Sequence, residues 1–270
     1  MEIPEVKRVS AIKKDYLARL AKEKKRPDGR SADEYRPIKI ERNIIKKAEG
    51  SARVKIGNTM VLAGIKLEVG EPYPDSPEEG AMTTSAELPP LASPEFEPGP
   101  PTPDAIELAR VVDRGIRESK YIPFDKLCIE PGEKVWIVFI DLHVLDYDGN
   151  LFDACSLAAS AALQNTIIPN ERYGLGENKP LPVGSPPVSC TFVKYENFIV
   201  VDPCLEEEQI AQARFTVALD KNGDIRAMQK GLRGSFTIDE IKNIIKRAQI
   251  HAKKIRKLLG EGNGKKNQKS

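Results

Sequence analysis

The stretch Lys134-Val-Trp-Ile-Val-Phe-Ile-Asp-Leu-His-Val-Leu-Asp146 and the segment behind it decide the fold. An apolar run this continuous predicts a strand at the centre of a sheet, because both of its faces must be buried. The turn Asp148-Gly149-Asn150 separates this strand from residues 152–166, where five alanines predict a helix that packs very closely on the sheet. Strand, turn and helix together predict one β–α half of the protein.

A second set of strands and a final helix lie further along the chain. Four short runs predict two hairpins, residues 188–194 with 198–201 and residues 215–219 with 225–229. Thr237-Ile-Asp-Glu240 is a capping box, in which the Thr hydroxyl accepts from the Glu amide while the Glu side chain reaches back. It predicts a helix that runs to Gly260. The sequence therefore predicts an α+β protein of two β–α halves.

The residues before the central strand supply the other elements of the first half. They predict a helix over 10–20, a hairpin around Gly57-Asn58, and a helix that Asp104 caps and that ends near Ser119. Residues 72–103 hold ten of the 21 prolines and predict a long irregular excursion with one strand over 81–88. A loop of this length is usually functional or packed on a partner.

Composition excludes several classes of protein. The 270 residues are enough for one large domain or two small ones, and a hydrophobic content of 40% excludes a disordered chain. No stretch approaches the roughly 18 uninterrupted apolar residues of a membrane span, which argues against a membrane protein. The four cysteines have no CxxC spacing and no nearby histidine: Cys128, Cys155, Cys190 and Cys204. We therefore expect no disulfide framework, no zinc site and a cytoplasmic location.

The net charge of +2 hides large blocks of opposite sign. Residues 1–30 carry ten bases and five acids, residues 67–109 carry ten acids and no base, and residues 241–270 carry ten bases against Glu261 alone. Segregated charge of this kind marks binding surfaces in some proteins and solvated faces in others. Charge alone leaves both interpretations open.

The sharpest charge feature is a helix with three arginines on one side. At 100° per residue, Leu108, Val111, Val112, Gly115 and Ile116 fall on one arc, whereas Arg110, Arg114 and Arg117 cluster opposite. Three guanidinium groups are poor neighbours unless something anionic lies between them. The spacing fits a row of phosphate contacts, and it also fits a solvated face with local salt bridges.

Other polar residues give weaker signals. The acidic run from Asp202 to Glu208 could hold a metal or a general acid, although a solvated loop is the commoner case. His143, inside the apolar strand, is expected to be a hydrogen-bonded core residue, and His251 has no evident acidic partner. The sequence contains no P-loop, GxGxxG, GxSxG or HExxH motif.

Several motifs, in their order along the chain, resemble those of the ribonuclease PH family. They are Arg26-Pro27-Asp28-Gly29-Arg30, Glu49-Gly50-Ser51-Ala52-Arg53-Val54 with Gly57-Asn58-Thr59, the Arg110 helix, residues 146–163 and Val200-Val201-Asp202-Pro203. The resemblance covers residues 26–258, and the chain is most similar to the non-catalytic ring subunit of the archaeal exosome. It implies two pseudo-symmetric halves, residues 26–169 and 187–260, with a helical extension over 1–25 and a disordered basic tail over 261–270.

The resemblance also implies that catalysis has been lost. Active members carry a loop similar to Gly-Gly-Thr-Arg-Thr-Ala that grips inorganic phosphate. Here the matching stretch is Gly149 to Ala154, so that Phe152 stands at the Arg position and Asp153 would repel phosphate. Active members also carry two acids six residues apart, and the matching positions here are Glu208 and Arg214. A cation at the second position removes a candidate metal ligand or general acid.

The function that the resemblance implies is a non-catalytic subunit with no cofactor and no metal site. Three copies would alternate with three catalytic ribonuclease PH-like subunits in a hexameric ring, with RNA-binding cap subunits on one face. Single-stranded RNA would thread through the ring, and Arg110, Arg114 and Arg117 would contact its phosphates. The catalytic partner would use inorganic phosphate, with magnesium as a candidate cofactor.

The sequence is also compatible with two other functions. One is an active phosphorolytic exoribonuclease that uses Asp202, Glu206, Glu207 or Glu208 as its acids. The other is a structural ring subunit without RNA contact.

Overall fold

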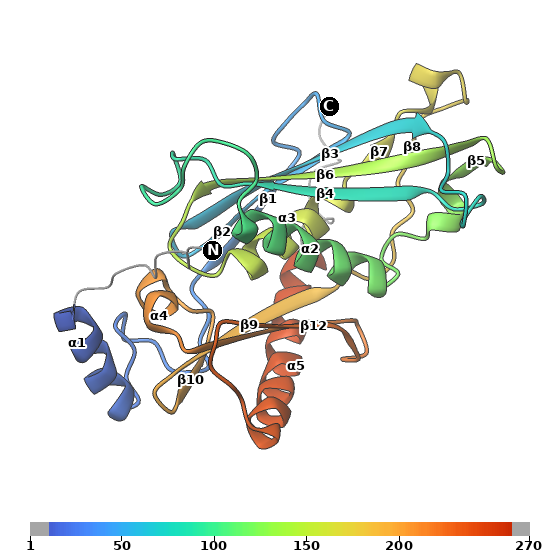
Figure 1. Cartoon of the computed structure of the whole chain (residues 1–270). Helices are drawn as coiled ribbons and strands as arrows, with labels where there is room; N and C mark the ends of the chain where they lie inside the picture. The colour runs from blue at the N-terminus through green and yellow to red at the C-terminus, as the bar shows by residue number, and fades with distance from the viewer. Residues whose placement is uncertain (1–10, 261–270) are drawn as a thin grey trace, which may run out of the picture.

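The larger of two main sheets is built around the strand that the sequence placed at its centre. The computed structural model describes residues 11–260, so the basic tail over 261–270 and the first ten residues lie outside the described residues (Figure 1). Strand β6 (Lys134–Asp146) pairs antiparallel with β3 and parallel with β4, and the sheet order is β1-β2-β3-β6-β4 with β5 also on β6. The other strands are β1 (Ile38–Arg42), β2 (Gly50–Ile56), β3 (Thr59–Gly70), β4 (Ala81–Glu87) and β5 (Cys128–Glu130). The hairpin expected at Gly57-Asn58 is the β2–β3 pair.

Helix α3 (Leu151–Leu163) lies under this sheet and is buried along its whole length. Its alanines let it approach β2 and β3 closely on one side and β9 on the other. Gly149 and Asn150 form the turn before it with positive φ angles of 89° and 58°. A Cβ at Gly149 would lie 2.5 Å from the backbone of Cys204, so this turn requires glycine.

The second half is a four-stranded sheet in the order β10-β9-β11-β12, followed by a long helix. The strands are β9 (Val188–Tyr195), β10 (Phe198–Val201), β11 (Ala213–Leu219) and β12 (Ile225–Gly231), and α5 spans Ile238–Gly260. The capping box forms as expected: Glu240 N donates to Thr237 Oγ1 (3.2 Å) and Thr237 N donates to Glu240 Oε2 (2.8 Å). Together the two halves give the expected α+β fold.

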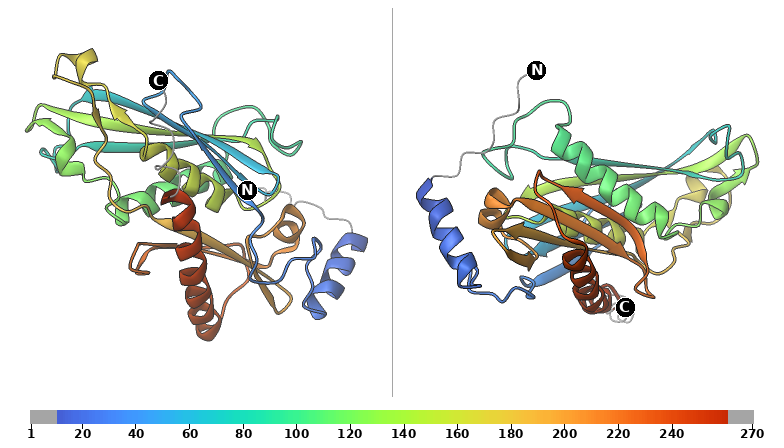
Figure 2. Two further views of the ribbon diagram at one scale, coloured as in Figure 1. Left: turned by 180° about the vertical axis from the view of Figure 1, so that it is seen from behind. Right: turned by 60° about the horizontal axis from the view of Figure 1, so that its bottom comes forward.

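The small sheet separates two layers of helix. On β9, Thr191 faces α3, while Cys190 donates through its thiol to the carbonyl of Ala248 on α5 (3.7 Å). The layers are therefore the large sheet, then α2 and α3, then the small sheet, and finally α5 (Figure 2). The described part of the chain includes no helix long and apolar enough to cross a bilayer, and all four cysteines are free.

Helix α2 (Pro103–Glu118) packs against β4, α3 and β12, so it touches both halves. Its N-cap is Thr102, whose hydroxyl accepts from Ala105 N (3.3 Å); the expected cap, Asp104, lies in the first turn instead. Pro103 takes the first helical position, where a missing N–H costs nothing. The side toward the core is apolar as expected, except that Val111 is only half-buried.

The chain before β1 crosses to the second half, where buried ion pairs hold it. Helix α1 (Ala11–Lys22) and the short α4 (Leu205–Ile210) lie at this junction, and the small β7 (Ile167–Ile168) and β8 (Lys179–Pro180) form a separate pair. Arg26 binds Glu207, and Arg36 binds Asp202, with all four side chains almost wholly buried. Asp202 and Glu207 are thus structural partners of arginines rather than acids of a solvated loop.

Candidate nucleic-acid interface

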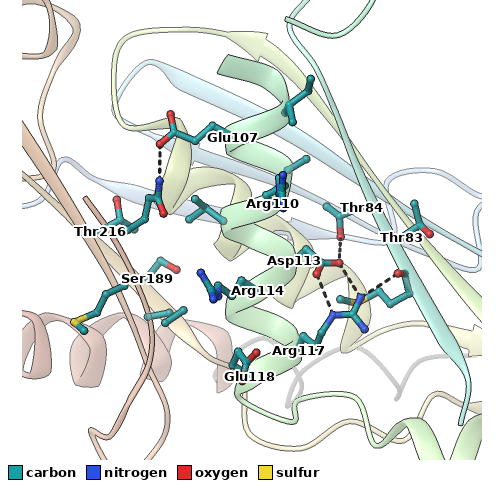
Figure 3. A pocket seen from close by; sticks show the side chains of 18 of the residues that line it. Thr83, Thr84, Glu107, Arg110, Asp113, Arg114, Arg117, Glu118, Ser189 and Thr216 are labelled. Carbon is teal, nitrogen blue, oxygen red and sulfur yellow. Dashed lines mark hydrogen bonds and ion pairs between the residues drawn. The ribbon is translucent and has the colours of Figure 1, made fainter. Parts of the chain in front are cut away.

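A groove of about 960 Å³ runs along α2 and lies between the two halves of the protein (Figure 3). Its lining comes from α2 and β4 of the first half and from β9, β11 and β12 of the second half. The three arginines that the sequence singled out all border it. The helix period therefore brings Arg110, Arg114 and Arg117 to one cavity.

The side chains of Arg110 and Arg114 are exposed in this groove, and their positive charges are not paired with an acid in the described structure. Within residues 11–260, neither guanidinium makes a hydrogen bond or an ion pair, and Figure 3 shows both without partners. Glu118 is one turn beyond Arg114 and also lines the groove, yet the two form no ion pair in the described structure. Two free cations about one helical turn apart form a site for an extended anion.

Arg117 differs from the other two arginines because it is already engaged. Its Nε donates to Asp113 Oδ2 (3.1 Å), and its Nη2 donates to the carbonyl of Met82 (3.2 Å). Its guanidinium also lies 5.4 Å from the ring centroid of Phe124. The set expected to contact phosphates thus divides into two free arginines and one that joins α2 to β4.

Besides the acids Glu107 and Asp113, which pair with Arg214 and Arg117, the rest of the groove offers hydroxyl and apolar contacts. The hydroxyl-bearing residues of its lining are Thr83, Thr84, Ser189 and Thr216. The exposed side chains of Ile106 and Met228 add an apolar surface on α2 and β12. Free guanidinium groups beside an apolar surface suit a polymer that combines phosphates with bases and sugars.

The positions that match the family's catalytic residues meet at a second, smaller pocket of about 210 Å³. Phe152, Glu208 and Arg214 all line it. The guanidinium carbon of Arg214 lies 4.1 Å from the Phe152 ring centroid, and Arg214 Nη2 binds Glu107 Oε1 at 2.6 Å. The carboxylate of Glu208 accepts from Tyr147 Oη (2.7 Å) and from Asn150 N (2.9 Å). Burial raises the pKa of Glu208.

Asp153 does not take part in this pocket, although the sequence suggested that it would repel phosphate there. Its side chain is buried and accepts from Tyr35 Oη (2.8 Å), Asn150 Nδ2 (2.8 Å) and Thr191 Oγ1 (2.8 Å). Burial raises its pKa to about 6, although these donors favour the charged form. Asp153 therefore connects α3 to β9 and to the chain before β1.

Both histidines differ from expectation. His143 is not a core residue: its side chain is half-exposed on the outer face of β6, where Nδ1 lies 3.1 Å from Glu87 Oε2. His251 is buried and has an acidic neighbour, since its Nε2 lies 3.6 Å from Asp33 Oδ1. Burial lowers the pKa of His251. Neither histidine lines the groove.

The sequence missed the residues of the second half that complete the site. Gln229 binds Glu107 Oε1 at 3.1 Å, and Met228 borders the groove. The only sequence signal was the amphipathic α2, which gives no information on what packs beside it. Over the described ranges, no group of three or more His, Cys, Asp or Glu side chains is placed to hold a metal ion.

Comparison with known proteins agrees with this geometry. A model of the 3′ exoribonuclease family, domain 1, matches residues 34–169, and a model of its domain 2 matches residues 185–250. The exosome complex component Rrp42 of Methanocella arvoryzae is 53% identical over 251 residues, which cover 93% of this chain and 96% of that protein. Rrp42 of Pyrococcus furiosus is 53% identical over 259 residues, covering 93% and 94%.

Solved structures give the same assignment. A chain of the Archaeoglobus fulgidus exosome with RNA bound to the active site superposes with a TM-score of 0.90 at 49% identity, covering 92% of this chain and 98% of that one. An archaeal exosome core gives a TM-score of 0.85 at 45% identity, covering 92% and 96%. Both family models and these relatives span the two halves that form the groove, and the chain therefore belongs to the 3′ exoribonuclease family of ribonuclease PH.

Proposed function

We propose that this chain is a non-catalytic ring subunit of an exosome, which holds the RNA backbone while a catalytic relative degrades the RNA from its 3′ end. The observation that carries the proposal is the pair of unpartnered guanidinium groups, Arg110 and Arg114, in the 960 Å³ groove. The relatives are named exosome components, and one similar structure contains an exosome with bound RNA. Contacts to phosphates alone would make the binding independent of RNA sequence and sensitive to salt.

The contacts made by the residues of the second pocket support the proposal that this chain has lost catalytic activity. A phosphorolytic site needs cations for inorganic phosphate and an acid or metal for the leaving oxygen. Here Phe152 fills the position of a phosphate-binding arginine, and Arg214 is already paired with Glu107. The remaining carboxylate, Glu208, accepts two internal hydrogen bonds. Arg214 and Glu208 thus bind internal partners at the position where active members would bind a substrate.

The proposed assembly is a hexameric ring of three heterodimers with a catalytic ribonuclease PH-like subunit, covered by RNA-binding cap subunits. Inorganic phosphate, with magnesium as the candidate metal, would act in the partner's site. A cytoplasmic location is part of the same proposal and is supported by four cysteines that form no disulfide. The relatives named as exosome components support the ring, whereas its stoichiometry and its caps are inferred from the family resemblance.

A phosphorolysis assay tests the proposal. The purified chain, its catalytic relative and the co-expressed complex are each incubated with single-stranded RNA, phosphate and magnesium. We expect no nucleoside diphosphate from the chain alone and processive release from the complex. Release by the chain alone at a rate similar to the complex would overturn the non-catalytic assignment. Failure of the two proteins to co-purify would overturn the assignment as a ring subunit.

A further inference from the structure

We propose that Arg214 is a positioning residue for RNA binding, because it holds the Glu107 carboxylate away from the two free arginines of α2. This inference rests on the proposed function, since it concerns how the same groove stays open to phosphate. It gives the position of a lost catalytic acid a new role. Arg214 lies on β11, and its partner Glu107 lies 107 residues earlier in the chain on α2.

The guanidinium group of Arg214 is closely packed against its neighbours. One face of its guanidinium lies on the Phe152 ring at 4.1 Å, and its Nη2 atom donates to Glu107 Oε1 at 2.6 Å. Gly231 lies beside the guanidinium, and a Cβ there would come within 2.5 Å of that Nη2 atom. Two of the residues that depart from the family's catalytic pattern, Phe152 and Arg214, thus contact each other directly.

If Arg214 did not bind it, Glu107 would have an alternative partner. Arg110 lies three residues further along α2, and oppositely charged residues at this spacing attract each other on a helix surface. In the structure Glu107 instead accepts from Arg214 and from Gln229 Nε2 (3.1 Å), both on the small sheet. Figure 3 shows the Glu107 carboxylate turned toward that sheet, while Arg110 projects into the groove. The carboxylate of Glu107, three residues before Arg110, is therefore paired with a cation outside the row of α2 arginines.

Stability alone does not explain the position of the Arg214 side chain. The Nε–H group of Arg214 is buried and has no hydrogen-bond acceptor in the described structure. Leaving a buried donor unpaired is unfavourable, so the placement of Arg214 has a cost in stability. What the arrangement does supply is a fixed α2 on which two cations are free and the Glu107 carboxylate is paired with the small sheet.

The test measures RNA affinity of the assembled ring in the absence of phosphate, so that no degradation occurs. The probe is a fluorescein-labelled single-stranded oligoadenylate, followed by anisotropy. Replacing Arg214 (R214A) frees Glu107 to pair with Arg110, and we expect affinity to fall roughly five-fold. Removing the acid as well (R214A with E107Q) should restore affinity to at least the wild-type value. R214K keeps a positive charge for Glu107 but loses the stack on Phe152, so we expect a loss of affinity smaller than that of R214A.

A second variant displaces Arg214 without changing any charge. In G231A the new methyl group occupies the space of the guanidinium end, and we expect the same loss of affinity and the same rescue by E107Q. If R214A folds poorly, G231A alone decides the question. A double variant that stays as weak as the single one would show that Arg214 touches RNA or only shapes α2, and would overturn the proposal.

The outcome is separable from the proposed function. If substitution of Arg110 and Arg114 leaves RNA affinity unchanged, the RNA-holding function itself is wrong. If that substitution weakens binding but R214A and G231A bind as well as wild type, only the role of Arg214 is wrong.

Discussion

At the scale of single residues, the most tightly bound charges lie where the chain before β1 meets the second half. Arg26 and Glu207 form a bidentate pair, with Nε–Oε1 at 2.8 Å and Nη2–Oε2 at 2.6 Å. Glu207 also accepts from Tyr195 Oη (3.0 Å) and from Cys204 N (3.0 Å). Such complete hydrogen bonding is what allows a charge pair to be buried at all. These contacts make residues 26–36 an integral part of the fold.

Removal of one partner should therefore cost far more than removal of an exposed acid beside it. For Glu207→Ala we expect the free energy of unfolding to fall by about 3–5 kcal/mol, because the Arg26 guanidinium stays buried without its counter-charge. Glu206 is the matched control: its side chain is half-exposed and pairs with Lys13 at the surface. Glu206→Ala should change stability by less than about 1 kcal/mol. Equal effects in urea unfolding of the two variants would contradict this account.

Asp153 should make stability depend on pH. Its pKa is raised to about 6 by burial, whereas an unfolded aspartate titrates near 4, so the folded protein keeps this proton to a higher pH. The stabilising contribution of the neutral form is complete below pH 4 and is lost as pH rises through 6. The difference in unfolding free energy between wild type and Asp153→Asn should therefore fall between pH 4 and 6 and then level off. Parallel curves for the two proteins would refute this interpretation.

At the scale of elements, α5 shows how a short local motif sets the start of a 23-residue helix. The Thr237 and Glu240 side chains each satisfy a backbone amide of the first turn. Thr237→Ala removes one of the two bonds, and we expect a loss of about 1 kcal/mol, seen as a melting temperature lower by about 2–4 °C. Thr237→Ser keeps the hydroxyl and should melt close to wild type. A melting temperature for the Ser variant as low as that of Ala would argue against the cap.

Elements defined by local patterns are those that the sequence predicted well. The apolar run of β6, the turn between β2 and β3 and the capping box of α5 each depend on neighbouring residues, and all three are confirmed. His143 shows the limit of the same reasoning. Strand alternation puts it on the outer face of β6 with Asp141, but the apolarity of the run masked that alternation.

The site could be predicted only in part, because half of it depends on contacts between distant segments. The helix period alone groups Arg110 with Arg114, and that grouping is confirmed by the groove. The sequence around Glu107 and around Arg214 does not predict their ion pair, because 107 residues separate the two positions. Asp153 was misplaced for the same reason: its partners Tyr35 and Thr191 lie 118 and 38 residues away along the chain.

At the scale of the whole molecule, the groove exists because the two halves dock against each other. One wall is α2 with β4 from the first half, and the other is β11 and β12 from the second. The layered packing of Figure 2 keeps α2 between the sheets, and the exposed side chains of Arg110 and Arg114 line this groove. A separated half would have the arginines without the opposite wall. We therefore expect RNA binding in this groove to require both halves of the fold.

The central claim is that Arg110 and Arg114 hold RNA through its phosphates, and the salt dependence of RNA affinity tests it most directly. Each phosphate contact to a single strand contributes about 0.7 to the slope of log affinity against log salt. In rings that carry Arg110→Ala and Arg114→Ala, we expect weaker binding and a slope shallower by about 1.4. Lys246→Ala with Lys253→Ala, two exposed positions on α5, removes the same charge elsewhere and should leave the slope unchanged. An unchanged affinity and slope in the arginine variant, with intact rings, would contradict the account and leave a purely structural subunit.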